Sequence, residues 1–302
     1  MRQSKIFAHL QLTRPANVVT AIADILAGFA IAGIGIYLTS FSNQDAYLID
    51  LAWLVLATIG LYAGGVAFND VFDADLDSVE RPERPIPSGR ATVKSAAIMA
   101  FLLLLMGVIA AYQVSMTSAL IAFAVALCAV IYDYWGKHQN FLGPINMGLC
   151  RAGNLLLGVS VVPDLVEKFA FMGLIPLVFV AAITMISSGE VHGKNKKALY
   201  GGLGMYLIII AAIVILAFTI GGKPLEVIPF VALFAYMIFP PLVKAIQKQE
   251  PKLIGKAVKA AVISLIILNA SLSAAFAGWL YGVLVLILLP ISLWLARKFA
   301  VT

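Results

Sequence analysis

Long apolar runs separated by short polar connections follow one another along nearly the entire chain. Each run is close to the ~20 residues that an α-helix needs to cross a bilayer. The pattern predicts an all-α, polytopic transmembrane helical bundle of nine to ten spans that forms a single domain over residues 1–302. The predicted spans lie at residues 18–38, 51–70, 93–112, 116–133, 144–162, 169–188, 199–221, 225–246, 255–277 and 279–297.

Positive charges along the chain predict its orientation, since Lys and Arg collect on the cytoplasmic side of a membrane protein. With a cytoplasmic N-terminus, nearly all basic connections face inward, and only Lys168 and Lys223 fall outside. A tenth span also brings Arg297 and Lys298 inside. We therefore expect an integral protein of the inner or plasma membrane. Its three most polar loops, near residues 70–93, 133–144 and 188–199, are expected to converge on one central cavity open to the cytoplasm.

Composition supports this class. Hydrophobic residues make up 62% and charged residues 12% of the chain, and the mean hydropathy is +0.99. The formal net charge is +6, but the basic residues are dispersed over short loops, which argues against a nucleic-acid partner. Cys128 and Cys150 lie in apolar runs, so neither a disulfide nor a cysteine metal site is expected. No small-residue cleavage site follows the first run, and no removable signal peptide is predicted.

A dense acid cluster ends the second apolar run, in a chain that has only 15 acidic residues. At helical spacing Asn69, Asp70, Asp73 and Asp77 share one face, whereas Asp75 points elsewhere. Carboxylates so close together repel one another unless a positive charge lies between them. Oxygen ligands without Cys or His favour Mg²⁺ or Mn²⁺ over zinc, and Mg²⁺ usually completes its shell with water and phosphate oxygens. The cluster therefore predicts a Mg²⁺ site at the membrane surface.

The cluster has two other possible interpretations, an EF-hand loop and a set of acid–arginine pairs. An EF-hand loop is excluded because Ser78 and Arg84 replace its required Gly and its last Glu. The acids and the following arginines can also pair with one another and merely cap the span. The arginines belong to a proline-rich loop, and guanidinium groups suit phosphate recognition. Arg84 and Arg90 are the candidate phosphate ligands there.

The second polar loop and the span after it supply further candidates. Arg151 lies within an apolar run, where an arginine is costly and normally faces a polar cavity or a charged partner. Diphosphate binding and an ion pair with Asp133 or Asp24 are the alternatives for it. Asp24, inside the first run, is expected to orient an acceptor, to pair with Arg151, or to be a hydrogen-bonded structural acid. The other polar candidates in this part of the chain are Lys137, Asn146 and Asn154.

The acid motif Asn69-Asp70-x-x-Asp73-x-x-x-Asp77, followed by Arg84-Pro85-Ile86-Pro87-Ser88-Gly89, resembles the signature of the UbiA superfamily of intramembrane prenyltransferases. Arg14-Pro15-x-Asn17 is similar to that family's opening, and the resemblance covers roughly residues 10–275. It implies nine spans and Mg²⁺-dependent transfer of a prenyl group from a polyprenyl diphosphate to an acceptor. The acid cluster would hold Mg²⁺, Arg84, Arg90 and Lys137 would bind phosphate, and Asn17 would contact substrate. The prenyl tail would lie in an apolar channel open to membrane lipids.

The third polar loop departs from the family pattern. The expected second acid motif is Asp-x-x-Asp-x-x-Gly-Asp, and this chain keeps only Glu190 and Gly193 of it, with Ser187 and Lys194 in place of the outer acids. The favoured explanation is that Lys194 and His192 bind diphosphate, so that a lysine charge replaces part of a second metal's charge. His192 is alternatively a general base. Glu190 remains a candidate metal ligand and catalytic residue.

These features predict a divergent family member, with an EboC-like branch as one candidate. The expected activity is Mg²⁺-dependent prenyl transfer to an unidentified lipophilic acceptor, with Asp70, Asp73, Asp77, Glu190 and Lys194 as the catalytic residues. The alternative is a non-catalytic isoprenoid- or lipid-binding protein, or a transporter, built on the same fold. A transporter is disfavoured because no internal repeat is visible.

Overall fold

The computed structural model describes residues 5–35, 45–139, 142–189, 193 and 195–299. Helices make up nearly all of these ranges, and no strand occurs in them, so the all-α class is confirmed. The helices are α1 (Lys5–Leu12), α2 (Pro15–Ile31), α4 (Asp45–Phe72), α5 (Ala74–Glu80), α6 (Val93–Tyr112), α7 (Met116–Tyr134), α8 (Leu142–Val159), α9 (Leu165–Phe169), α10 (Leu174–Ser187), α11 (Lys196–Leu216), α12 (Pro224–Lys248), α13 (Pro251–Ala277), α14 (Trp279–Leu286) and α15 (Leu288–Lys298).

Every predicted span overlaps a helix or a pair of consecutive helices, and residues 36–38 of the first span lie outside the described residues. Within the described ranges, eight helices are long and apolar enough to cross a membrane, and a ninth span results if α1 and α2, bent by 43°, count as one. Helix α8 is not among them, because Asn146, Arg151 and Asn154 make its 18 residues too polar. The bundle is thus confirmed, and the choice between nine and ten spans stays a prediction.

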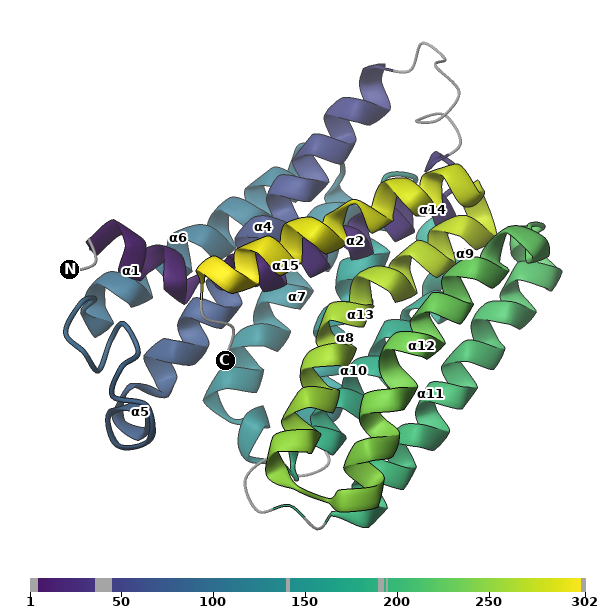
Figure 1. The fold of residues 1–302 in the computed structure, drawn as a ribbon. Helices are drawn as coiled ribbons and strands as arrows, with labels where there is room; N and C mark the ends of the chain where they lie inside the picture. The colour runs from purple at the N-terminus through teal and green to yellow at the C-terminus, as the bar shows by residue number, and fades with distance from the viewer. Residues whose placement is uncertain (1–4, 36–44, 140–141, 190–192, 194, 300–302) are drawn as a thin grey trace.

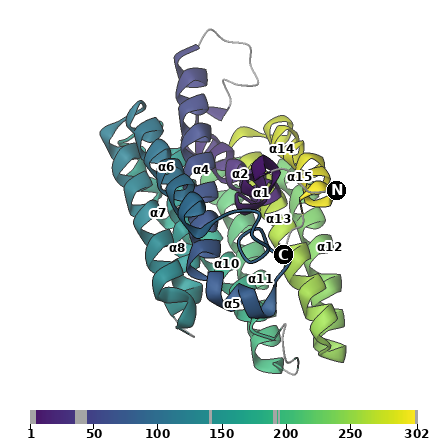
Figure 2. The ribbon, with the colours of Figure 1, turned by 90° about the vertical axis from the view of Figure 1, so that its left-hand side faces the viewer.

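Helices α2 and α13 form the centre of the bundle. From Val18 to Ile31 every residue of α2 except Ile22 is buried, and α13 packs against α2, α10, α12 and α14. Helices α11, α12 and α13 run side by side, while α14 and α15 cross the bundle obliquely and α15 follows α2 (Figure 1). The view in Figure 2 places α6 and α7 on one side of α4 and the C-terminal helices on the other. Helix α2, the most buried helix of the N-terminal half, therefore lies between the N-terminal and the C-terminal helices.

Glycines allow the helices that carry polar residues to approach closely. A Cβ atom on Gly28 of α2 would lie 2.4 Å from the carbonyl oxygen of Leu155 and 2.6 Å from the Cα of Gly158 in α8. Real Cβ atoms do not come that near to backbone atoms, so a side chain here would push the two helices apart. The contact sets the distance between the polar side chains of α2 and those of α8.

The acid motif spans the junction between α4 and α5. Asp73 lies between the two helices with φ −91° and ψ 5°. Its backbone N–H still donates to the Asn69 carbonyl at 2.9 Å, and the Asp77 N–H donates to the Asp73 carbonyl at 2.8 Å. Because the i to i+4 hydrogen bonds continue through the junction, the acids keep the helical spacing that the sequence predicted.

Candidate functional site

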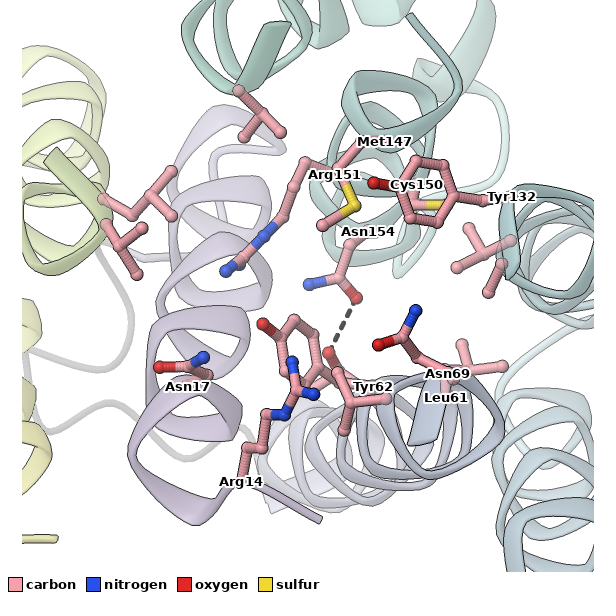
Figure 3. A pocket seen from close by; sticks show the side chains of 18 of the residues that line it. Arg14, Asn17, Leu61, Tyr62, Asn69, Tyr132, Met147, Cys150, Arg151 and Asn154 are labelled. Atoms are coloured by element: carbon pink, nitrogen blue, oxygen red, sulfur yellow. Dashed lines mark hydrogen bonds between the residues drawn. The ribbon is translucent and has the colours of Figure 1, made fainter. Parts of the chain in front are cut away.

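A cavity of about 330 Å³ opens among six helices: α2, α4, α7, α8, α10 and α13. In Figure 3, Arg14 and Asn17 come from α2 and its start, Tyr62 and Asn69 from α4, and Arg151 and Asn154 from α8. The apolar wall includes Leu61, Val66, Val125, Ile183 and Leu265. The polar lining consists of Arg14, Asn17, Thr58, Tyr62, Asn69, Tyr132, Asp133, Arg151, Asn154 and Thr184.

One end of the cavity lies at the acid motif. We call Arg14, Asn69, Tyr132 and Asp133 the mouth of the cavity. Arg14 Nη2 donates to Asp70 Oδ1 at 2.6 Å, so Arg14 joins the cavity lining to the acid cluster. Asn69 Nδ2 donates to Asp133 Oδ1 at 3.0 Å. Asn69 and Asp133, at the edges of the first and second polar loops, are 64 residues apart in sequence and meet at the mouth. The predicted convergence of the third loop on the same cavity stays a prediction.

Cations balance the acids behind the mouth. Arg84 Nη1 lies 2.7 Å from Asp77 Oδ2 and 3.4 Å from Asp70 Oδ1, so one guanidinium bridges two carboxylates. Asp70 and Asp77 are 6% and 3% exposed, which places this cluster in a setting where unpaired charges are costly. The acid–arginine pairing that the sequence left open is therefore present, and it adjoins a cavity.

Lys137 brings the second polar loop to the same cluster, where its ammonium group forms an ion pair with Asp73. Arg90 takes a different position. It donates to Gln11 Oε1 at 2.7 Å and to the Glu83 carbonyl at 2.6 Å, and so fastens the proline-rich loop to α1. The predicted phosphate-binding roles of Lys137 and Arg90 stay predictions.

The opposite end of the cavity contains a buried polar network. We call Thr58, Tyr62, Arg151 and Asn154 the inner end. Arg151 Nη1 donates to Asp24 Oδ2 at 2.6 Å, and the guanidinium lies 5.1 Å from the centre of the Tyr62 ring. Of the two partners predicted for Arg151, the structure shows Asp24. Asp24 itself is fully buried and is not among the residues that line the cavity.

Asparagine side chains complete this network. Asn154 Nδ2 donates to Asp24 Oδ2 at 2.9 Å, and Asn269 Nδ2 donates to Asp24 Oδ1 at 2.6 Å. Thr58 Oγ1 donates to Asn154 Oδ1 at 2.7 Å, the contact drawn as a dashed line in Figure 3. Asp24 therefore accepts hydrogen bonds from three side chains, and it holds α2, α8 and α13 together.

Several residues of the site had not been selected from the sequence. Arg14 belongs to the Arg14-Pro15-x-Asn17 motif, which offered a signal. Asn269 is an amide within an apolar span, and such polar residues are candidates for function on general grounds. Thr58 and Tyr62 offered no signal, because residues of these types are ordinary in apolar runs.

Some predicted residues do not reach the described cavity. Glu190, His192 and Lys194 lie outside the residues that the structure describes, and their roles stay predictions. Gly193, in the same loop, is described and has a left-handed φ of 65°. Asn146 lies on α8 but is not part of the lining. Asn17 does line the cavity, and its predicted contact with substrate stays a prediction.

The side chains at and behind the mouth offer oxygen atoms that could coordinate Mg²⁺. Among the residues described, no three His, Cys, Asp or Glu side chains are grouped to hold one metal ion. The available donors are nevertheless carboxylate and amide oxygens, which are the ligands Mg²⁺ prefers. The donor chemistry therefore fits the ion, while Arg14, Arg84 and Lys137 balance the acids in this arrangement.

The chain is similar in sequence to known proteins. A family model described as the UbiA prenyltransferase family matches residues 26–258. A digeranylgeranylglyceryl phosphate synthase from Methanosarcina mazei is 32% identical over 198 residues, which cover 62% of this chain and 64% of the relative. The synthase from Sulfolobus acidocaldarius is 30% identical over 231 residues, covering 72% and 77%. The matched stretch thus spans slightly under two thirds of the first relative's length and more of the second's.

Solved structures agree with the fold. A digeranylgeranylglyceryl phosphate synthase superposes with a TM-score of 0.67 at 16% identity, covering 90% of this chain and 99% of that chain. A UbiA homologue from Archaeoglobus fulgidus bound to DMAPP and Mg²⁺ superposes with a TM-score of 0.62 at 16% identity, covering 92% and 99%. At this level of identity the likeness concerns the arrangement of the helices.

Proposed function

This chain belongs to the UbiA prenyltransferase family, and from that premise we propose that it transfers a prenyl group from a polyprenyl diphosphate to a lipophilic acceptor with the help of Mg²⁺. The names of the relatives and the DMAPP bound to the Archaeoglobus homologue support a diphosphate donor. The observation that carries the proposal is the acid cluster behind the mouth of the cavity, where three acids meet three cations from separate segments, next to a cavity with an apolar wall.

The charged groups at and behind the mouth are suited to bind a leaving diphosphate. The bond between the allylic carbon and the diphosphate oxygen breaks with its electron pair going to the diphosphate, and the growing negative charge must be stabilised. Arg14, Arg84 and Lys137 are the cations proposed to take the phosphate oxygens when the donor binds. Mg²⁺, when bound by Asn69, Asp70, Asp73 and Asp77, supplies additional positive charge. Arg90 keeps the proline-rich loop in place through its bonds to Gln11 and Glu83.

The apolar wall is suited to the carbon side of the reaction. Leu61, Val66, Val125 and Ile183 line the cavity and exclude water, which would otherwise capture the allylic cation. The acceptor's nucleophilic atom forms the new bond to the allylic carbon, and the acceptor then loses a proton. In this proposal Glu190, His192 and Lys194 act from the third loop, with Lys194 replacing one of the family's acids.

The proposal is tested with full-length protein in membranes incubated with labelled geranylgeranyl diphosphate and a cell lipid extract. Wild-type membranes are expected to form labelled product with Mg²⁺ and none with EDTA. Asp73→Asn and Asp77→Asn are expected to lower turnover by about 100-fold, the usual effect of removing a group that stabilises a developing charge.

Asp75→Asn is the matched control, because Asp75 is an exposed acid of the same motif that points away from the cluster. Its turnover should equal that of the wild type. Unchanged turnover in Asp73→Asn and Asp77→Asn would contradict the assignment of the acid cluster. Bound but unconverted diphosphate in the wild type would contradict the transferase proposal.

A further inference from the structure

The charge at the inner end of the cavity bears on the kind of acceptor. Arg14 and Arg151 are the two cations among the described residues that line the cavity, and Arg14 faces the acid cluster at the mouth. Arg151 is therefore the cation available to the inner end. Its charge is compensated by Asp24, at 2.6 Å. The inner end has a cationic side chain but no net charge.

This compensation is built into the helix packing. Asp24 is fully buried and is held by Asn154 and Asn269 as well as by Arg151. Thr20 accepts a further bond from Arg151 Nη2 at 2.5 Å. Because these residues lie on three different helices, Asp24 cannot turn away from Arg151 without breaking contacts between α2, α8 and α13.

A buried anion at the inner end would lack a counter-charge. Placing a phosphate or carboxylate in a low-dielectric site of zero net charge costs its hydration without a compensating ion pair. A neutral hydroxyl or carbonyl oxygen can accept a hydrogen bond there without adding a charge. A guanidinium carries five N–H donors, and Arg151 directs one to Asp24 and one to Thr20. The Tyr62 side chain also lines this end.

The inner end is equally unsuited to the hydrocarbon tail of the donor. A prenyl chain packed against it would cover the N–H donors of Arg151 that are not directed to Asp24 and Thr20, which is unfavourable in a buried site. Tyr62 and Asn69 are seven residues apart on α4, which corresponds to about 10 Å along a helix. An acceptor can therefore place its reacting atom near the mouth while a polar group of the same molecule reaches the inner end.

We infer that the acceptor presents an uncharged hydroxyl or carbonyl group, and not a phosphate or carboxylate, to the inner end of the cavity, where the Asp24–Arg151 pair selects against anions. This inference rests on the proposed transferase function. Asp24 acts here as a specificity-determining residue through Arg151, since it does not itself line the cavity.

The test measures equilibrium binding of two matched probes to full-length protein in phosphatidylcholine nanodiscs. The probes are monooleoylglycerol, which is neutral, and monooleoylglycerol phosphate, which is anionic; they share one acyl chain. Mg²⁺ and unreactive geranylgeranyl thiolodiphosphate are kept at saturation so that the donor site is filled. The wild type is expected to bind the neutral probe at least about tenfold more tightly than the anionic one.

Two single variants change the net charge of the inner end in opposite directions, and a double variant and a control keep it unchanged. Asp24→Asn leaves Arg151 uncompensated and should improve relative binding of the anionic probe by about tenfold. Arg151→Gln should worsen it, and the double variant Asp24→Asn with Arg151→Gln should match the wild type. Thr20→Val is the matched control, because it removes a hydrogen bond to Arg151 without changing charge, and it should keep the wild-type preference.

The outcomes separate the two proposals. Tighter binding of the anionic probe by the wild type, no binding of the neutral probe, or a preference that does not follow the charge series would overturn the inference. If Asp24→Asn does not fold, the charge-neutral double variant and Arg151→Gln still decide it. Failure of the proposed function is read separately, as absence of Mg²⁺-dependent thiolodiphosphate binding in the wild type.

Discussion

Arg14 connects the backbone geometry of the site to its electrostatics. It has a left-handed φ of 46°, a conformation that is unfavourable for a residue with a side chain. It lies at the 43° bend between α1 and α2, and from there its guanidinium reaches Asp70 at 2.6 Å. Strained residues that persist in a fold gather at functional sites. Arg14 is one of two non-glycine residues with positive φ in the described chain, and it lines the cavity.

Arg14→Gln is expected to weaken binding of a polyprenyl thiolodiphosphate in the presence of Mg²⁺ by about 10- to 100-fold, the range for loss of a charged hydrogen bond. Equilibrium binding of labelled thiolodiphosphate measures this. Arg81→Gln is the control, since Arg81 is an exposed arginine at the start of the proline-rich loop. Equal losses in both variants would mean that general positive charge, and not the position of Arg14, determines donor binding.

The contact between α2 and α8 determines the geometry of the inner end. Helix α2 carries Asp24 and α8 carries Arg151 and Asn154, and the two helices meet at Gly28 and Gly158. The Arg151–Asp24 pair, at 2.6 Å, lies beside this close approach of the two backbones at the glycines. The packing of α2 against α8 and the buried Arg151–Asp24 pair therefore depend on each other.

Gly28→Ala is expected to destabilise the protein by about 1–3 kcal/mol, because the new methyl group overlaps backbone atoms of α8. Thermal unfolding in detergent measures the change as a lower Tm. Gly204→Ala in α11 is the matched control, since a Cβ there meets nothing within 4 Å. An unaltered or higher Tm for Gly28→Ala would show that the two helices adjust without loss.

The whole molecule has an uneven distribution of charge between its two ends. The turn between α12 and α13 is flanked by four exposed lysines, Lys244 and Lys248 on α12 and Lys252 and Lys256 on α13. It lies at the same end of the molecule as α5 and the acid motif (Figure 1). At the opposite end of α12, Lys223 is paired with Glu226 at 3.2 Å. The positive-inside rule therefore predicts that the end with the acid motif faces the cytoplasm.

This orientation can be checked by cysteine labelling in a Cys128→Ala, Cys150→Ala background. A membrane-impermeant maleimide is expected to modify Lys248→Cys only from the cytoplasmic side of sealed vesicles. Lys223→Cys should be modified only from the other side. The reverse pattern would contradict the predicted topology, and labelling of both positions from one side would contradict the path of α12 across the membrane.

Local features of the sequence determined the helices, the acid motif and the family. Apolar runs predicted the positions of the long helices, because the length of a run and its hydrophobicity are properties of neighbouring residues. The spacing of Asn69, Asp70, Asp73 and Asp77 predicted a common face, and the hydrogen bonds through Asp73 preserve it. The family assignment followed from the same motif and is confirmed.

Only the tertiary structure decided which residues meet. Asp24 and Arg151 are 127 positions apart, and Asp24 and Asn269 are 245 apart. Such pairs depend on how helices pack, which the pattern of one run does not encode. Thr58 and Tyr62 belong to an apolar run. The sequence of such a run does not distinguish residues that face lipid from residues that face a cavity. The charge balance of the inner end therefore emerges only when α2, α4, α8 and α13 are assembled.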